Sequence, residues 1–203
     1  MSLMTRMRDR ILESPIVYRA WQAPFAARKL DPVLRHNDLR GVRRVLDLAC
    51  GPGTNTPWFA GVDYVGVDIN PAYIATARQR FGRSFITADI TQYRHEDGEP
   101  FDFILLNSFL HHLSDEDARR VLGHTATLLS DDGHVHVLDL ILPSRPSLAR
   151  ALALADRGDY ARPVEGWRTL LQEFFTPVLF EPYSLDVAGV PAWRMLYFKG
   201  KAR

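Results

Sequence analysis

The sequence contains a single cysteine, Cys50, among 203 residues. One cysteine cannot form a disulfide within the chain, and a metal site would have to be built from histidines and carboxylates instead. The chain also lacks any apolar run approaching the ~18 residues of a membrane span, and its first residues lack the apolar stretch of a signal peptide. These absences predict a cytoplasmic protein that is neither exported nor inserted into a membrane.

A large excess of charge of one sign is also missing, because the formal net charge is only +1. Residues 1–44 carry ten Lys and Arg against four Asp and Glu, a balance of +6, whereas residues 45–203 carry fifteen against twenty, a balance of −5. A basic segment can attract nucleic acid or an acidic substrate. Its arginines alternate with apolar residues at helical spacing, however, so we interpret it as a solvated helix face and expect no nucleic-acid partner. The oligomeric state stays open.

The apolar content of 46% is enough for one sizeable core. We therefore expect residues 1–203 to form a single domain with four parts. Helical segments interrupted by prolines predict a helical cap over residues 1–40. Residues 41–142 are expected to form the central core, residues 143–175 an excursion with a helix, and residues 176–203 a terminal hairpin.

Short apolar runs alternate with amphipathic stretches along the chain. This alternation predicts βαβ units, that is, a mainly parallel sheet covered by helices on both faces. The expected strands cover residues 44–49, 64–69, 84–89, 101–107 and 134–140, and the expected helices cover residues 71–81, 115–129, 147–156 and 164–174. Two more strand-like runs, 176–183 and 193–198, have no helix between them and predict an antiparallel hairpin. The fold class is therefore α/β: a Rossmann-like, doubly wound, mainly parallel seven-stranded sheet.

A glycine-containing loop follows the first expected strand, in the segment Asp47-Leu-Ala-Cys-Gly-Pro-Gly-Thr. Gly51 and Gly53 let the backbone approach a ligand, and a helix is expected to begin near Thr54 or Pro57. Two glycines after a strand also occur in tight turns, so this loop is a weak signal when it is taken alone. We interpret it as the first part of a ligand site.

Polar residues stand at the carboxyl ends of the next three expected strands. Asp68 lies seventeen residues after Gly51, at a position where a carboxylate commonly accepts hydrogen bonds from both hydroxyls of a ribose. Asp89 ends the third strand and Asn107 ends the fourth. Asp residues are also common helix caps, but the placement of the whole set predicts a nucleoside crevice at a topological switch point.

These segments resemble the motifs of the class I S-adenosylmethionine-dependent methyltransferases, over roughly residues 40–142 and more loosely through the terminal hairpin. The resemblance rests on Asp47-x-Ala49-x-Gly51-x-Gly53, on Val65-Gly-Val-Asp68, on Ala88-Asp89-Ile90, and on the run from Phe101 to Asn107 before Leu110-His-His-Leu-Ser. Where the family has its first motif glycine, this sequence has Ala49, a departure that needs a slightly roomier backbone path.

The resemblance implies S-adenosylmethionine as the cofactor and a part for each motif. Asp47 and the loop 51–53 would hold the methionine portion, Asp68 the ribose hydroxyls, Asp89 with Ile90 the adenine, and the carbonyl of Asn107 the amino group. The predicted cofactor-binding residues are Asp47, Ala49, Gly51, Gly53, Thr54, Asp68, Ile69, Asp89, Ile90 and Asn107.

Methyl transfer from a sulfonium is an in-line displacement that depends mainly on positioning in a water-poor pocket. His111 and His112, just past the fourth strand, are candidates for a base or an acceptor contact, and structural histidines are the alternative. Tyr18 is the third catalytic candidate. The cap residues proposed to wall the acceptor cavity are Tyr18, Trp21, Gln22 and Phe25.

The excursion contains a polar cluster with a glycine, Asp156–Arg162, which is interpreted either as a lid or as a surface turn held by ion pairs. Recognition of the acceptor would fall to this segment and the cap. Because so little chain is left for recognition, we predict a small-molecule acceptor, with no nucleic-acid or membrane partner. The sequence does not identify the methylated atom.

Two other function classes are compatible with parts of this pattern. A nicotinamide-dependent oxidoreductase shares the architecture, but Thr56 and Pro57 stand where its third motif glycine would allow close helix packing. A regulatory protein that binds the cofactor without catalysis would have a blocked acceptor cavity. His134 and His136 lie two apart on one strand, a spacing that offers two nitrogens to a metal, but no carboxylate or cysteine pattern completes the set. We therefore predict no metal.

Overall fold

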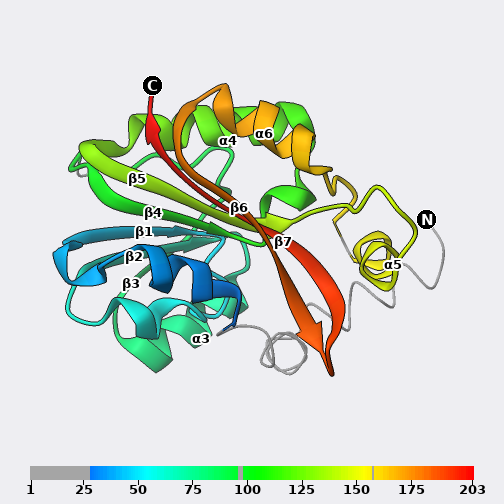
Figure 1. Cartoon of the computed structure of the whole chain (residues 1–203). Helices are drawn as coiled ribbons and strands as arrows, with labels where there is room; N and C mark the ends of the chain where they lie inside the picture. Colours follow the sequence, from blue (N-terminus) through cyan, green and yellow to red (C-terminus); the bar gives the residue numbers. More distant parts are fainter. Residues whose placement is uncertain (1–27, 96–97, 157) are drawn as a thin grey trace.

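Seven strands form one sheet in the order β3-β2-β1-β4-β5-β7-β6 (Figure 1). The structure, a computed structural model, describes residues 28–95, 98–156 and 158–203. The strands are β1 (Arg44–Leu48), β2 (Asp63–Asp68), β3 (Ser84–Thr87), β4 (Phe101–Asn107), β5 (Leu129–Leu140), β6 (Phe175–Val187) and β7 (Val190–Ala202). The predicted cap residues Tyr18, Trp21, Gln22 and Phe25 lie outside the described residues.

The strand order reverses between β1 and β4. β1 pairs in parallel with β2 on one side and with β4 on the other, so the chain winds outward in both directions from this pair. In such a sheet the loops after the two central strands diverge and leave a crevice at their carboxyl ends. The predicted doubly wound topology is confirmed, and it places the loops after β1, β2 and β4 around one point.

The sheet ends in the predicted antiparallel hairpin. β7 pairs with β5 and β6 pairs with β7, both antiparallel, so the last strand lies inside the sheet and β6 forms its edge. Both hairpin strands have 13 residues and are longer than the apolar runs indicate. The turn residues Ala188 and Gly189 have φ of 49° and 79°, the left-handed conformation that a tight hairpin turn requires.

Helices cover both faces of the sheet. They are α3 (Pro71–Phe81), α4 (Asp115–Thr127), α5 (Leu148–Ala155) and α6 (Val164–Gln172), with 3-10 turns η1 (Leu39–Gly41), η2 (Thr56–Phe59) and η3 (Leu110–His112). Residues 28–36 are also helical. α4 and α6 pack on one face, and α3 and the helix 28–36 pack on the other (Figure 1). None of the described helices is long and apolar enough to cross a membrane.

Two apolar clusters separate along this sheet because successive strand residues point to opposite faces. Leu46 and Ile104 pack under α4 and α6, whereas Val45 and Phe103 pack under α3 and the helix 28–36. All four side chains are at most 2% exposed. The central strands are thus buried on both faces, as the continuous apolar runs predicted.

Two local expectations need correction. The glycine loop leads into the single 3-10 turn η2 rather than into an α-helix, because the next strand begins at Asp63 and leaves too little chain for an α-helix of ordinary length. Strand β3 ends at Thr87, so Asp89 lies two residues beyond the strand end instead of on it. Asp89 instead opens a turn in which its own carboxylate accepts the backbone N–H of Thr91 at 2.9 Å.

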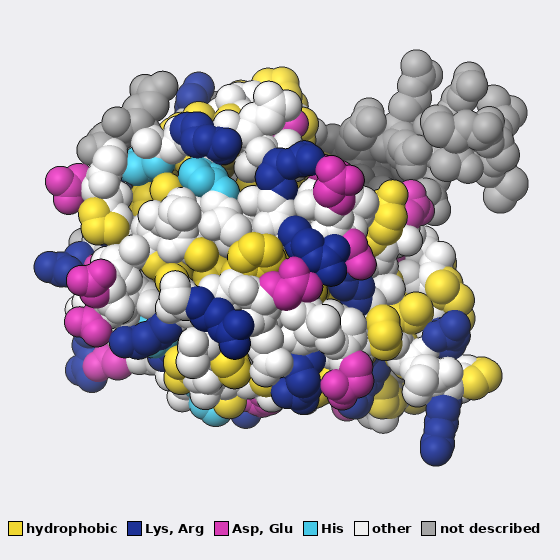
Figure 2. Space-filling view, turned by 90° about the horizontal axis from the view of Figure 1, so that it is seen from above, with side chains coloured by type: hydrophobic (Ala, Val, Ile, Leu, Met, Phe, Trp, Pro, Cys, Tyr) yellow, Lys and Arg dark blue, Asp and Glu magenta, His cyan; other side chains and the backbone are white. Residues whose placement is uncertain are grey.

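The basic residues at the start of the described chain pair with acidic residues that come later in it. Arg35 and His36 both contact Glu181, at 2.9 and 2.7 Å. Arg44 contacts Asp63 at 2.8 Å. On the face seen in Figure 2, basic and acidic side chains are interspersed rather than gathered by sign. The uneven charge along the sequence therefore does not form one basic patch on this face.

Candidate cofactor and acceptor site

A cavity of about 420 Å³ opens at the carboxyl ends of the central strands. It is lined by Ala49, Gly51, Asp68, Ile69, Asn70, Tyr73, Asp89, Ile90, Thr91, Asn107, Ser108, Phe109, His112 and Leu113. Small-molecule sites usually measure ~300–1,000 Å³. The residues come from the loops after β1, β2, β3 and β4, so the cavity lies at the switch point of the sheet.

Most residues predicted from the cofactor motifs meet in this cavity. Those that line it are Ala49, Gly51, Asp68, Ile69, Asp89, Ile90 and Asn107. Asp47, Gly53 and Thr54 are not among the residues that line it. His112 is the one catalytic candidate on the wall among the described residues, and Tyr18 lies outside the described chain.

The loop after β1 brings backbone to the cavity through left-handed residues. Ala49, Gly51 and Gly53 have φ of 59°, 54° and 77°. A Cβ at position 53 would lie 2.7 Å from the ring of Phe81, so only glycine fits there. Ala49 adopts the same left-handed conformation with a side chain, at a cost of about 1–2 kcal/mol. Replacement of the family's glycine by Ala49 therefore leaves the loop in its glycine-like path.

Asp68 ends β2 with its carboxylate at the cavity and 8% exposed. One oxygen accepts the backbone N–H of Gly51 at 2.9 Å, and the other accepts that of Asn70 at 2.8 Å. Burial raises the pKa of Asp68, and the two N–H donors act against this rise. A carboxylate has about four acceptor positions, so each oxygen keeps one for a ligand hydroxyl.

Two isoleucines, Ile69 and Ile90, give the cavity an apolar surface that a flat ring can contact. Ile69 follows directly after β2 and is 66% exposed, which is unusual for so large an apolar side chain. Ile90 lines the same cavity and is buried. Asp89 stands beside Ile90, and its Oδ1 is held by the backbone N–H and hydroxyl of Thr91 at 2.9 and 2.8 Å. These three residues combine apolar contact with an acceptor for an amino group.

A buried hydrogen-bond network connects Asp47 to the cavity wall. Asp47, which is 0% exposed, accepts from the Tyr64 hydroxyl at 2.7 Å and from Nδ2 of Asn55 at 3.1 Å. Asn55 Oδ1 in turn accepts from Nδ2 of Asn107 at 3.1 Å. Burial raises the pKa of Asp47 to about 7. The carboxylate thus reaches the cavity only through two amides, and sequence reasoning missed Asn55.

The polarity of this network follows from its carboxylate end. Above its pKa of about 7 the Asp47 carboxylate is ionised and only accepts hydrogen bonds, so Asn55 turns its NH₂ toward Asp47 and its oxygen toward Asn107. Asn107 therefore donates to Asn55 and keeps its own Oδ1 as an acceptor, which the Ser108 hydroxyl approaches at 3.1 Å. The network presents an acceptor oxygen at the cavity wall.

Ser108 and Lys29 form a second feature that the sequence did not reveal. Ser108 has φ of 56°, a left-handed conformation that is uncommon for serine. Its hydroxyl accepts from the Lys29 ammonium at 2.9 Å. Burial lowers the pKa of Lys29 to about 8, while the carboxylates of Asp156 and Asp139 act in the opposite direction. A cation from the helix 28–36 therefore stands beside the cavity.

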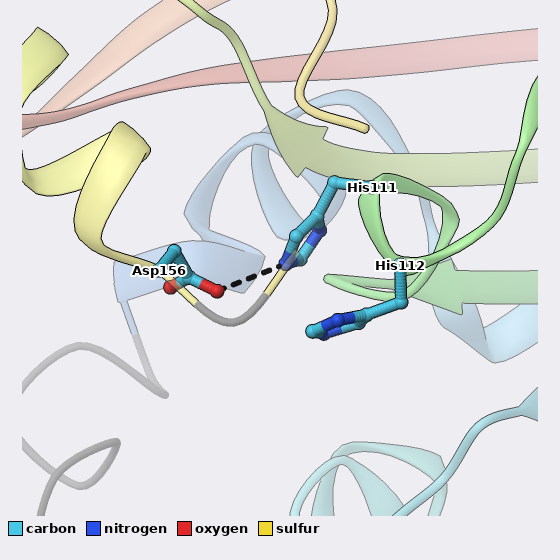
Figure 3. A group of neighbouring side chains, drawn as sticks. All are labelled: His111, His112 and Asp156. Carbon is cyan, nitrogen blue, oxygen red and sulfur yellow. Dashed lines mark ion pairs between the residues drawn. The ribbon is translucent and has the colours of Figure 1, made fainter. Parts of the chain in front are cut away.

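His111 is buried and contacts two carboxylates, Asp139 and Asp156, of which Figure 3 shows Asp156. Its Nδ1 lies 2.6 Å from Oδ1 of Asp139, and its Nε2 lies 3.4 Å from Oδ1 of Asp156. Burial on its own would lower the pKa of His111, but Asp139 and Asp156 together raise it to about 9. In this arrangement His111 is an imidazolium at neutral pH and does not accept a proton.

The polar cluster of the excursion packs on η3. Arg162, 7% exposed, donates to Asp115 at 2.8 Å and to the carbonyls of Leu110 and Leu113, both at 2.9 Å. The backbone N–H of Tyr160 donates to the His111 carbonyl at 3.0 Å. An ion pair and hydrogen bonds therefore tie the segment to η3 and α4, and its role as a lid stays a prediction.

His134 and His136, the two histidines of β5, do not form a shared site. His136 is 1% exposed, stacks on Phe103 with ring centroids 3.7 Å apart, and has its Nδ1 2.9 Å from the Tyr197 hydroxyl. Burial lowers its pKa well below the usual value. The side chain of His136 is thus a core histidine between two aromatic rings.

The single cysteine, Cys50, is also buried, and burial raises the pKa of its thiol.

Residues 45–133 match the family model described as "Methyltransferase domain". The chain carries a class I S-adenosylmethionine-dependent methyltransferase domain. It is 26% identical over 194 residues to trans-aconitate 2-methyltransferase of Variovorax paradoxus, an alignment that covers 91% of this chain and 72% of the relative. It is 33% identical over 118 residues to the enzyme of the same name from Escherichia coli strain SE11, covering 54% of this chain and 45% of the relative.

Solved methyltransferases share the fold of this methyltransferase. The N-methyltransferase NodS of Bradyrhizobium japonicum, in complex with S-adenosyl-L-homocysteine, superimposes with a TM-score of 0.72 at 19% identity and 99% coverage of both chains. Human N-acetylserotonin methyltransferase, in complex with S-adenosylmethionine, gives a TM-score of 0.70 at 19% identity, covering 95% of this chain and 57% of that one.

The cofactor of this methyltransferase is S-adenosylmethionine, and the cavity of the domain fits it. Asp68 keeps two acceptor positions for ribose hydroxyls, and the exposed Ile69 offers apolar surface for the adenine base. The third motif glycine of a nicotinamide enzyme is absent, since Thr56 stands there within η2. Of the two enzyme classes that share this architecture, the family match supports the methyltransferase and not the oxidoreductase.

Proposed function

We propose that this methyltransferase methylates a small carboxylic acid that enters the cavity between Asn107 and Leu113. The observation that carries the proposal is the extent of the cavity beyond the predicted cofactor residues, along Ser108, Phe109 and His112. A cofactor-binding protein without catalysis would have this end blocked. The open end therefore favours an enzyme.

The cofactor contacts are proposed from the cavity geometry. Asp68 would accept from both ribose hydroxyls with the acceptor positions that Gly51 and Asn70 leave open. Ile69 and Ile90 would enclose the adenine, and Asp89 would accept from its amino group. Gly51 supplies close backbone, and Asn107 supplies an acceptor for the amino group of the methionine portion.

When bound, S-adenosylmethionine supplies a methyl group on a positively charged sulfur. The residues of this chain need to place an acceptor oxygen in line with that methyl group and to exclude water. Phe109 and Leu113 provide apolar walls for this purpose. The displacement forms one oxygen–carbon bond as the carbon–sulfur bond breaks, and a carboxylate acceptor gives up no proton.

A carboxylate acceptor fits the charges at this end of the cavity. Nδ1 and Nε2 of His111 face Asp139 and Asp156, so neither nitrogen is open to take a proton from a hydroxyl acceptor, whereas a carboxylic acid is already ionised at neutral pH. Lys29 and His112 offer a cation and a ring N–H beside the same end. The similarity to enzymes named trans-aconitate 2-methyltransferase supports the same class of acceptor.

The test has two stages. Thermal shift with S-adenosyl-L-homocysteine, with NAD and without ligand should show stabilisation by the first alone, because a ligand that binds only the folded state raises the melting temperature. Methyl transfer from S-adenosyl-[methyl-³H]methionine should then be measured with matched small acids, amines and alcohols. Transfer to acids with retention of label in an ester supports the proposal. Transfer only to amines or alcohols contradicts the acceptor class, and stabilisation by NAD alone contradicts the whole proposal.

A further inference from the structure

Three side chains with metal-binding atoms converge at the acceptor end of the cavity. His111 and His112 come from η3, and Asp156 follows the last turn of α5 (Figure 3). One potential ligand atom from each residue lies within 4.8 Å of the other two. No other group of three or more such residues meets this spacing in the described part of the chain.

The spacing of His111 and Asp156 matches metal coordination. His111 Nε2 and Asp156 Oδ1 are 3.4 Å apart, which is long for a charge-assisted hydrogen bond. Two ligands each bound at ~2.1 Å to a tetrahedral centre lie about 3.4 Å from one another. Two imidazoles and one carboxylate are also a donor set that first-row transition metals accept with positions left open.

From this geometry we propose that His111, His112 and Asp156 bind one first-row transition-metal dication of the zinc type. The ion would have three protein ligands and at least one open position. His111 would coordinate through Nε2 and keep the proton on Nδ1. The proton now held between His111 and Asp156 would pass to solvent as the ion binds.

Asp139 already supplies the outer contact that such a site requires. Metal-ligating histidines usually donate their other ring N–H to a carboxylate or carbonyl, which fixes the ring orientation. His111 Nδ1 lies 2.6 Å from Oδ1 of Asp139, which is 0% exposed. Asp139 is fixed in turn by the backbone N–H groups of Leu110 and Leu140, at 2.8 and 2.6 Å. The first ligand is therefore held in place before any ion arrives.

Close packing fixes the third ligand against the first two. A Cβ at Gly158 would lie 2.0 Å from Cδ2 of His111, so a residue with a side chain does not fit there. The N–H of Gly158 donates to Asp156 at 3.3 Å, and that of Tyr160 donates to the His111 carbonyl at 3.0 Å. The segment that carries Asp156 is thus tied to η3, so Asp156 and His111 keep a fixed relation to one another.

The charges around the cluster allow a dication but limit its affinity. Asp139 and Asp156 contribute two carboxylates, and the Lys29 ammonium acts on both. Lys29 opposes a second cation, yet its ammonium is held at 2.9 Å by Ser108, which lines the cavity. His112 also lines this cavity, so an ion held by His112 would stand beside it. In this part the inference rests on the proposed function, because an acceptor carboxylate would occupy the open position.

The experiment uses the full chain without a histidine tag, stripped with chelator. Co²⁺ is titrated and followed by its visible absorption, and Zn²⁺ is titrated by calorimetry. One equivalent of either ion is expected to bind. His112→Asn and Asp156→Asn should each weaken binding at least tenfold, and Asp139→Asn should weaken it ten- to hundredfold. His36→Gln is the matched control, because His36 also pairs with a carboxylate, Glu181 at 2.7 Å, but stands on another element.

The results separate this inference from the proposed function. Absence of saturable Co²⁺ or Zn²⁺ binding, or equal binding by His112→Asn and the wild-type chain, overturns the metal site. Circular dichroism establishes that each variant is folded, and His112→Asn decides the matter if Asp156→Asn does not fold. Thermal stabilisation by S-adenosyl-L-homocysteine without metal binding rejects only the metal site. Metal binding without that stabilisation rejects only the proposed function.

Discussion

Replacing Asp68 with alanine tests the centre of the cofactor site. The substitution removes two acceptor positions proposed for ribose hydroxyls, and hydrogen bonds to a charged group contribute about 1.5 kcal/mol or more each. The expected loss is about 3 kcal/mol, which corresponds to about 150-fold in the dissociation constant of S-adenosyl-L-homocysteine. Isothermal titration calorimetry on the folded variant measures it.

Asp68→Ala should also lower the stability of the folded chain. Gly51 and Asn70 each lose the acceptor of a backbone N–H, which costs about 1–2 kcal/mol. Part of this cost is offset, because the raised pKa of Asp68 shows that burial disfavours its charged form. The variant should therefore melt at a slightly lower temperature but remain folded.

Asp102→Ala is the matched control for Asp68→Ala. Asp102 is also a carboxylate that accepts two backbone N–H groups, from Arg43 at 2.8 Å and Arg44 at 3.2 Å. It stands near the amino end of β4, whereas the cavity lies at the carboxyl ends of the strands. Its loss should lower stability without changing the affinity for S-adenosyl-L-homocysteine. An affinity of Asp68→Ala within threefold of the wild-type value would refute the assignment of the ribose to Asp68.

Three further predictions concern residues around the cavity. Asn55→Leu breaks the connection from Asp47 to Asn107 and should weaken S-adenosyl-L-homocysteine binding about tenfold, the loss of one hydrogen bond to a charged group; an unchanged calorimetric affinity contradicts the network. The pKa of Asp47 is raised from 3.8 to about 7 in the folded chain, so the folded state holds this proton more tightly than the unfolded state. Protonation of Asp47 therefore stabilises the fold fully below about pH 4. This stabilisation, which amounts to up to about 4 kcal/mol of unfolding free energy, is lost as the pH rises through 7. Urea unfolding of the ligand-free chain at pH 4.5, 6 and 8 should show this decline in unfolding free energy, and Asp47→Asn should remove it. If the unfolding free energy of the wild-type chain and of Asp47→Asn changes equally with pH, the assignment to Asp47 is refuted. Gly158→Ala forces a Cβ to within 2.0 Å of the His111 ring and should lower the unfolding free energy by about 2 kcal/mol, whereas an unchanged melting temperature would contradict this packing.

Local signals account for the parts of the fold that the sequence predicted well. The bounds of α3 agree residue for residue with the expectation, because Asn70 caps its first turn, Pro71 occupies the first helical position and Gly82 ends it at a φ of 60°. The continuous apolar run of β4 likewise indicated a strand buried on both faces. Each of these signals lies within a few residues of the element that it specifies.

The side-chain networks of the site could not be predicted in this way. Asn55 lies 52 residues from Asn107, and Lys29 lies 79 residues from Ser108. No periodicity or spacing connects residues so far apart, and their contacts follow only from the order of the strands. His111 shows the same limit, since its role as an imidazolium depends on Asp139, 28 residues later in β5. The sequence therefore predicted which strand ends meet but not how their side chains pair.

The inner position of β7 has a consequence for how the chain folds. β5 carries Asp139, and its free side is covered only when β7 pairs with it, from Leu140 with Met195 to Val135 with Gly200. During synthesis the complete run from β1 to β5 emerges from the ribosome before β7 does, so β5 is for that time an open strand edge able to pair with another chain. Truncations that remove residues 190–202 should therefore yield aggregation-prone protein, even though every residue that lines the cofactor cavity is retained.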